Sequence, residues 1–198
     1  MDSFDNNKAK IIRQISSGRK DKSLVGFVDE EAIPIVNLIN SLQNFYTTSS
    51  CSGRVLLQTN PGVPDKRLSN RVYVSHKKVS KAQIMKVLNE NETDGEIWFI
   101  FNSFILHVCA RSIEDADKFL VAAKRAGLKR AGIFQLRKRI MLEIIGTQYM
   151  AAPIVRGKEL VVSEQYVGEL VDIANEKMKK NWDKLEKFNE EIKSLFFE

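Results

Sequence analysis

The chain has 198 residues, of which 43% are apolar, so it can bury a hydrophobic core and is not a disordered polymer. It carries 31 basic and 25 acidic residues, for a formal net charge of +6. Its two cysteines exclude a disulfide-stabilised scaffold and suit a reducing compartment. The polar N-terminus predicts no signal peptide, and no apolar run approaches the ~20 residues that span a membrane, so we expect a cytoplasmic protein.

The apolar periodicity predicts helices and strands in an irregular order along the chain. Helices are expected at residues 8–17, 29–42, 80–89 and 112–126, and strands at 45–58, 71–77, 96–101, 104–111 and, in several short pieces, within 131–162. Ser80 and Ser112 are suitable N-caps, and Asp29 could cap the second helix. Strands and helices that do not alternate regularly favour an α+β fold with a mixed, largely antiparallel sheet and flanking helices.

The C-terminal segment, residues 164–198, predicts one long helix. Val171, Met178, Leu185 and Ile192 recur every seven residues. A second line with the same spacing comprises Ala174, Asn181, Phe188 and Leu195. The spacing fits either a coiled-coil seam or a helix that packs on its own domain, and we favour the second because the pattern holds for only four heptads and includes the polar Asn181. We therefore expect residues 1–198 to form a single catalytic domain with a long C-terminal helix.

Several common chemical motifs are absent from the sequence. It contains no G-x-G, no P-loop, no G-x-S-x-G and no H-E-x-x-H, so a Rossmann-type nucleotide site is not expected. His76, His107, Cys51 and Cys109 are scattered and include no C-x-x-C pair, so no metal site is expected.

Two segments carry unusual sets of polar side chains. In residues 45–54, FYTTSSCSGR, strict strand alternation would place Ser49, Cys51 and Gly53 on one face and Tyr46, Thr48, Ser50, Ser52 and Arg54 on the other. Such a run suits a bound polar ligand, although a Ser/Thr-rich edge strand has the same composition. In FILHVCAR, residues 104–111, His107, Cys109 and Arg111 share one face and resemble a ligand surface, although a lone histidine is more often structural.

Basic residues gather in two blocks that contain no acidic residue. Residues 66–86 hold seven lysines and arginines, and residues 118–142 hold eight. The blocks could form a phosphate-binding surface if the fold brings them together, or they could be ordinary solvated faces.

The segment FYTTSSCSGRVLL closely resembles the signature of the wybutosine-synthesising protein 3 family, in its archaeal stand-alone form. VGFVDEE, VSHKK, FILHVCAR, AGLKRAGI and KELVVSEQYVGELVDIANEKM match in the same order, so the resemblance covers nearly the whole chain. It implies an S-adenosylmethionine-dependent tRNA methyltransferase. The reaction would methylate the N-4 ring nitrogen of the 7-aminocarboxypropyl-demethylwyosine base at position 37 of phenylalanine tRNA.

The resemblance and the residue chemistry together imply roles for three sets of residues. Asp29 and His107 are the candidate proton acceptors. The cofactor would be held by Ser49, Ser50, Cys51, Ser52, Gly53 and Arg54. The tRNA would be bound by Lys77, Lys78, Lys129, Arg130, Arg137, Lys138 and Arg139.

One departure from the family pattern leaves other functions open. Family members carry Phe-Glu-Pro before the strand that holds Leu-His-Val, whereas this chain has Phe101, Asn102 and Ser103. One alternative to the methyltransferase is therefore a non-catalytic RNA-binding protein on the same fold. The other alternative is an assembly protein that works through its C-terminal helix.

Overall fold

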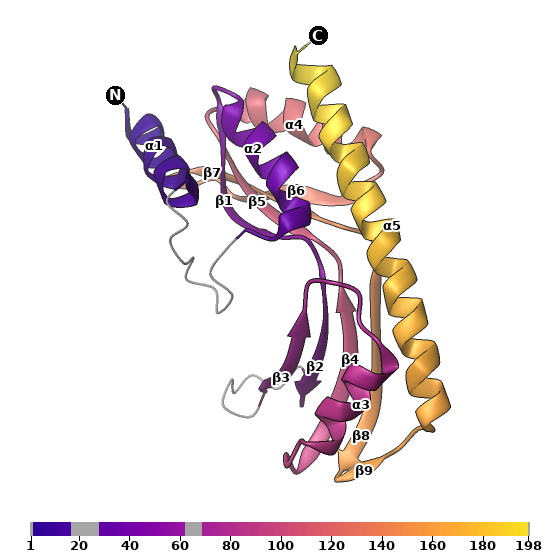
Figure 1. Cartoon of the computed structure of the whole chain (residues 1–198). Helices are drawn as coiled ribbons and strands as arrows, with labels where there is room; N and C mark the ends of the chain where they lie inside the picture. The colour runs from indigo at the N-terminus through magenta and orange to yellow at the C-terminus, as the bar shows by residue number, and fades with distance from the viewer. Residues whose placement is uncertain (1, 17–27, 62–68, 198) are drawn as a thin grey trace. The chain divides into compact units, whose positions relative to one another are not determined.

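The computed structural model describes residues 2–16, 28–61 and 69–197, and these divide into two compact units (Figure 1). Unit 1 comprises Met1–Ser52, Phe104–Thr147 and Trp182–Glu198, and unit 2 comprises Gly53–Ser103 and Gln148–Asn181. The α+β class is confirmed, with antiparallel pairing in both sheets and a long C-terminal helix. That residues 1–198 act as one catalytic domain stays a prediction.

Unit 1 is built on a four-stranded sheet with helices on both faces. The strand order is β1 (Phe45–Cys51), β5 (Ile105–Ala110), β7 (Ile140–Ile145) and β6 (Arg130–Gln135). On one face, α2 (Ile33–Ser41), α4 (Ile113–Arg125) and the last part of α5 (Glu164–Phe197) bury a continuous apolar core. On the other face, α1 (Ser3–Ser16) packs Phe4 and Ile11 against Tyr46, Cys109 and Met141.

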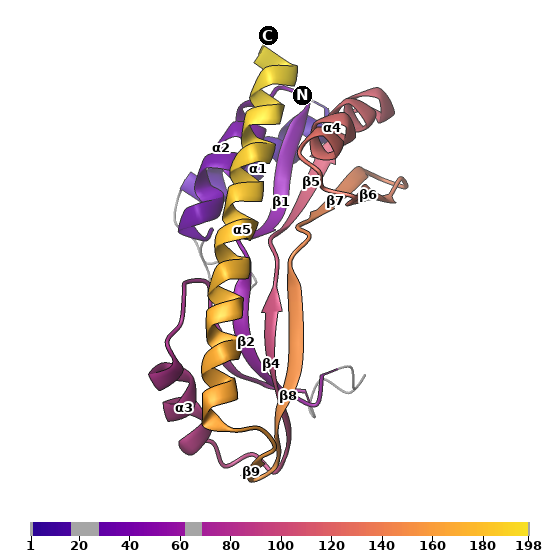
Figure 2. The same ribbon diagram turned by 90° about the vertical axis from the view of Figure 1, so that its right-hand side faces the viewer.

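Unit 2 is built on a five-stranded sheet, whose strands β2, β4 and β8 run side by side in Figure 2. The order is β3 (Arg71–Ser75), β2 (Arg54–Thr59), β4 (Gly95–Asn102), β8 (Tyr149–Gly157) and β9 (Glu159–Leu160). Helix α3 (Lys81–Asn89) and the first part of α5 belong to this unit, and Asn175 of α5 exchanges hydrogen bonds with the backbone of Val79 at 2.8 and 3.0 Å.

The predicted helix caps are confirmed at two helices. Ser80 and Gln83 form a reciprocal capping box at α3, with bonds of 3.2 and 2.8 Å. The Ser112 side chain accepts the Asp115 N–H at 3.1 Å, and α4 is followed by Gly127 at a φ of +78°.

The predicted helix at residues 29–42 begins with a short 3-10 turn, Glu30–Ala32, before α2. Asp29 occupies the N-cap position, but its side chain makes no capping hydrogen bond, so the predicted capping role is wrong. The carboxylate instead accepts the backbone N–H of Ser52, just after the end of β1.

The single strand predicted at residues 45–58 is wrong, because the chain leaves one sheet and enters the other. β1 ends at Cys51 and pairs with β5, whereas β2 begins at Arg54 and pairs with β3 and β4. Gly53, at a φ of +102°, lies in the connection, where a residue with a Cβ would be strained.

The long C-terminal helix packs on its own chain, as favoured. Leu185, Phe188 and Ile192 lie in the core of unit 1, and Val171, Ala174 and Met178 are buried in unit 2. No helix within the described ranges has both the length and the apolar character to cross a membrane.

Candidate active site

A β-bulge in β1 decides which side chains of this strand face away from the core. Tyr46 pairs with Cys109 and Ser49 pairs with His107, with a register shift between Thr47 and Ser49. Since Cys109 and His107 lie on the same face of β5, the bulge places Ser49 and Cys51 on the face of Tyr46. The predicted strict alternation, which placed Tyr46 and Ser49 on opposite faces of the strand, is therefore wrong.

A row of polar residues that ends in a glycine crosses the outer face of the unit 1 sheet. Ser49, His107, Glu143 and Gly132 are successive cross-strand partners on β1, β5, β7 and β6. His107 Nε2 lies 3.0 Å from Glu143 Oε1, and the two side chains are 28% and 37% exposed. The carboxylate fixes the ring orientation of His107, as expected for a base or hydrogen-bonding group rather than a buried core residue.

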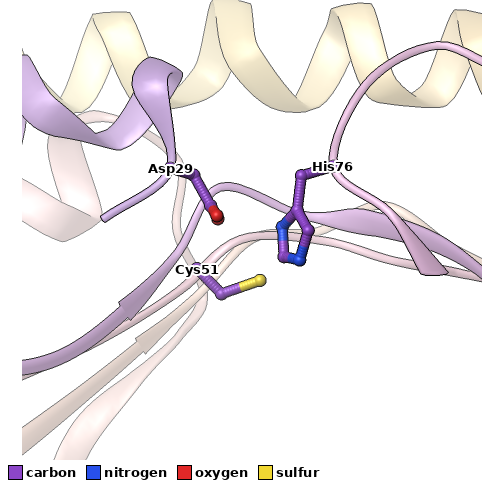
Figure 3. A group of neighbouring side chains, drawn as sticks. All are labelled: Asp29, Cys51 and His76. Carbon is purple, nitrogen blue, oxygen red and sulfur yellow. The ribbon is translucent and has the colours of Figure 1, made fainter. Parts of the chain in front are cut away.

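Asp29 is anchored to the end of β1. Its Oδ2 accepts the backbone N–H of Ser52 at 2.6 Å. Figure 3 shows the Asp29 and Cys51 side chains turned toward each other, and a carboxylate oxygen and the Cys51 Sγ lie within 4.8 Å. The structure thus brings one predicted proton acceptor beside two residues of the predicted cofactor segment.

Helix α2 holds the start of β1 in place through a buried polar pair. The Asn40 amide donates to Thr47 Oγ1 at 3.0 Å, and the Thr47 N–H donates to Asn40 Oδ1 at 2.9 Å. Because both groups are buried, the pair specifies the register of α2 on the strand that leads to Ser49.

The remaining residues of the cofactor segment occupy the junction between the strands. Ser50 and Cys51 end β1, and Ser52 is fully buried. Arg54 begins β2 in unit 2, directly opposite Asn102 of β4. Within the described ranges the Arg54 Nε is buried without a hydrogen-bond partner, which leaves a donor for an anionic ligand group.

Cys109 and Arg111 do not line a ligand surface, contrary to the interpretation of FILHVCAR. Arg111 forms ion pairs with Asp2, at 2.6 Å, and with Asp5, and its guanidinium lies 4.3 Å from the centre of the Phe4 ring. Cys109 is buried beneath α1, and burial raises the pKa of its thiol above the usual value. Both residues contact α1, whereas His107, on the same face of β5, pairs with Glu143 of β7.

The predicted tRNA-binding residues are all exposed and belong to both units. Lys77 and Lys78 follow β3 in unit 2, whereas Lys129 and Arg130 enter β6 in unit 1. Arg137, Lys138 and Arg139 form the turn between β6 and β7. Lys66 and Arg67 of the first basic block lie outside the described residues.

Two neighbours of His107 were missed from the sequence. Glu143 is the only charged residue of the otherwise apolar strand IMLEII, which was a readable signal. Phe134 lies at a register shift in β6, and its ring centre is 5.1 Å from that of His107. Phe134 shares the face of Gly132 by simple alternation, but only the pairing of β6 with β7 and of β7 with β5 brings that face beside His107, so its position had no local signal.

Comparison with known proteins shows to which family this chain belongs. The family model described as Methyltransferase TYW3 matches residues 6–194. The chain belongs to the TYW3 methyltransferase family.

Relatives in this family carry specific names. A Thermococcus sibiricus protein, 34% identical over 97% of this chain and 95% of its own length, is named tRNA(Phe) 7-((3-amino-3-carboxypropyl)-4-demethylwyosine(37)-N(4))-methyltransferase. A Methanocaldococcus jannaschii protein of the same name is 39% identical over 78% of this chain and 81% of its own length. A mouse protein, 34% identical over 87% of this chain and 68% of its own length, is named tRNA wybutosine-synthesizing protein 3 homolog.

Solved structures share the TYW3 fold. A Pyrococcus horikoshii protein superposes with a TM-score of 0.86 at 32% identity, covering 97% of this chain and 95% of the other. An Aeropyrum pernix protein gives a TM-score of 0.74 at 26% identity, covering 84% and 98%. The fold and family expected from the sequence motif are therefore confirmed.

Proposed function

We propose that this chain transfers a methyl group from S-adenosylmethionine to the N-4 ring nitrogen of the 7-aminocarboxypropyl-demethylwyosine base at position 37 of phenylalanine tRNA, in the cytoplasm. The observation that carries the proposal is the TYW3 family match over residues 6–194, together with the reaction named for the archaeal relatives. Membership of a methyltransferase family implies a methyl donor.

Residues Ser49–Arg54 fit the polar end of S-adenosylmethionine. Ser49 and Ser50 lie near the end of β1, Gly53 has no side chain to keep a ligand from the backbone, and the Arg54 Nε has no hydrogen-bond partner within the described ranges. An arginine pairs well with the carboxylate of an amino-acid group. When bound, S-adenosylmethionine would supply an electrophilic methyl group: as the bond from the ring nitrogen to that carbon formed, the sulfur–carbon bond would break and the sulfur would leave as a neutral thioether.

Asp29 is our first candidate for the proton acceptor, and His107 is the second. The Ser52 N–H holds one oxygen of Asp29 at 2.6 Å, which fixes the carboxylate beside the cofactor segment. Glu143 similarly orients His107, at 3.0 Å. A fixed base satisfies the geometric requirement of general-base catalysis, since it needs no reorientation when the proton leaves the ring nitrogen.

Replacing Arg54 by alanine should weaken S-adenosylmethionine binding. The lost charge-assisted contact is worth ~1.5–3 kcal/mol, which corresponds to about one to two decades in affinity. Calorimetric titration of the purified variant measures the change. Arg125→Ala, an exposed arginine on α4, is the matched control, and equal affinities for both variants and the native chain would remove Arg54 from the cofactor site.

Replacing Cys51 by serine should leave most of the methyl transfer in place. Direct attack by the ring nitrogen needs no thiol nucleophile, and serine preserves the size of the side chain. Single-turnover transfer rates and cofactor affinity are measured together. Complete loss of transfer with intact cofactor binding would instead make Cys51 a nucleophile or acid.

Reversing the charges of the β6–β7 turn, as Arg137→Glu, Lys138→Glu and Arg139→Glu, should weaken tRNA binding by about one decade or more at low salt. The salt dependence should also become shallower, because fewer counterions are released when fewer phosphates are contacted. Filter binding over a salt series gives both quantities. The control reverses three exposed lysines of α5, Lys179, Lys187 and Lys193, and if both triple variants bind alike the β6–β7 turn is not part of the tRNA surface.

The decisive experiment combines the purified chain, S-adenosylmethionine and phenylalanine tRNA that carries the demethylated base. Mass spectrometry of the digested tRNA should detect one added methyl group per base. The second candidate function, a non-catalytic RNA-binding protein, is favoured by Asn102, which lies opposite Arg54 at the position where the sequence resemblance leads us to expect glutamate. Binding of tRNA without cofactor binding or transfer would establish that alternative.

A further inference from the structure

An exposed aromatic side chain stands beside His107 on the outer face of the unit 1 sheet. Phe134 lies in the β6 bulge between Ile133, which packs against the core, and Gln135. Its side chain is 54% exposed although it contacts the His107 ring. A phenylalanine that is ordered by a neighbour but half in solvent is positioned to contact a ligand.

The surface next to Phe134 is open and polar. A Cβ added at Gly132 would meet none of the described atoms within 4 Å. Gly132 is the cross-strand partner of Glu143, whose carboxylate holds His107. We call this set of residues the Phe134 patch; it comprises Phe134, His107, Glu143 and Gly132. The patch thus combines an aromatic ring, a hydrogen-bonding pair and free space.

Cations lie on the same strand and turn as this patch. Arg130 begins β6, and Arg137 and Lys138 follow it, all exposed and without an acidic residue between them. The strand therefore offers an aromatic ring flanked on both sides by positive charge. That combination is typical of surfaces that bind single-stranded nucleic acid, where bases stack on aromatic rings and cations follow the phosphates.

We propose that the Phe134 patch is a nucleobase-docking site, in which an unpaired RNA base stacks on Phe134 and its edge contacts the His107–Glu143 pair. The cations of β6 and its turn bind the adjoining phosphates. A hydrocarbon surface is a poorer fit, because it would bury the Glu143 carboxylate without a further partner. The proposal rests on the proposed function, since it assigns a part of the tRNA surface.

The test compares tRNA binding by the native chain, Phe134→Ala and Phe134→Leu in fluorescence anisotropy. Loss of stacking should weaken binding roughly 5- to 150-fold in the alanine variant, without changing the slope of the salt dependence. Phe197→Ala, which truncates a 62%-exposed phenylalanine of the same unit, is the matched control and should bind normally. The leucine variant should remain weak, because stacking rather than apolar area is lost.

Phe134→Trp gives an independent readout. Stacking should quench the new indole fluorescence when tRNA is added, relative to the native chain titrated in parallel. If the native chain fails to bind tRNA at all, the proposed function fails. If the native chain binds tRNA and Phe134→Ala binds it equally well, the docking site is overturned while tRNA binding stands. Binding of both chains to anionic lipid vesicles is measured as well. If Phe134→Ala loses vesicle binding instead of tRNA binding, the docking site is overturned in the same way.

Discussion

Asp29→Asn should reduce methyl transfer by about two to four orders of magnitude, the usual contribution of a general base. Asparagine still offers an oxygen to the Ser52 N–H, so the local backbone should be preserved. Affinity for S-adenosylmethionine should be unchanged, because only proton acceptance is lost. Single-turnover rates with the demethylated tRNA measure the effect.

Two further variants separate chemistry from structure at this position. Asp29→Ala removes both the base and the bond to Ser52, and should lower thermal stability in addition to the rate. His107→Gln tests the second candidate, since it keeps a hydrogen-bonding group beside Glu143. Full activity of Asp29→Asn, together with a His107→Gln variant that binds tRNA normally but transfers no methyl group, would transfer the catalytic role to His107.

Phe188→Ala should destabilise the fold by about 3–5 kcal/mol, the range found for large aromatic truncations in packed cores. Phe188 is fully buried in unit 1, and its ring meets that of Phe119 edge-on at a centroid distance of 5.6 Å. The cavity left behind cannot be filled by a shift of the helix alone, because Leu185 and Ile192 are locked in the same core. Thermal denaturation, followed by circular dichroism, measures the loss.

Phe197→Ala on the same helix is the matched control, and it should leave the melting temperature nearly unchanged because its side chain is already mostly exposed. Deleting residues 181–198 removes Leu185, Phe188 and Ile192 together and should prevent unit 1 from folding. A truncated chain as stable as the native one, accompanied by conversion of a dimer to a monomer, would support the coiled-coil interpretation instead.

Local structure was readable wherever the determining contacts are near in sequence. Ser80 and Ser112 bond to backbone groups three residues away, so their capping patterns predict the starts of α3 and α4. The seven-residue spacing of α5 reflects one continuous buried stripe. Family membership was equally accessible, because the SSCSGR motif is specific in its order.

The errors concern features that depend on distant strands. Residues 45–58 contain no proline and a single glycine, Gly53, which continuous strands also tolerate, so the local sequence does not show that β1 and β2 belong to different sheets. Asp29 resembles a cap in sequence, but its partner is the Ser52 backbone, which only the folded chain brings near. Such long-range pairings are set by tertiary packing rather than by propensity.

Because of the bulge in β1, the number of residues in this strand decides which side chains face outward as much as the identity of those residues does. Thr48 is the extra residue between the pairs Thr47–Val108 and Ser49–His107. A chain that lacks residue 48 would therefore keep Ser49 opposite His107, whereas one that lacks Ser50 would bring Cys51 opposite Leu106, on the core side. Deleting Thr48 should therefore keep the Cys51 thiol on the outer face of β1, whereas deleting Ser50 should turn it toward the core.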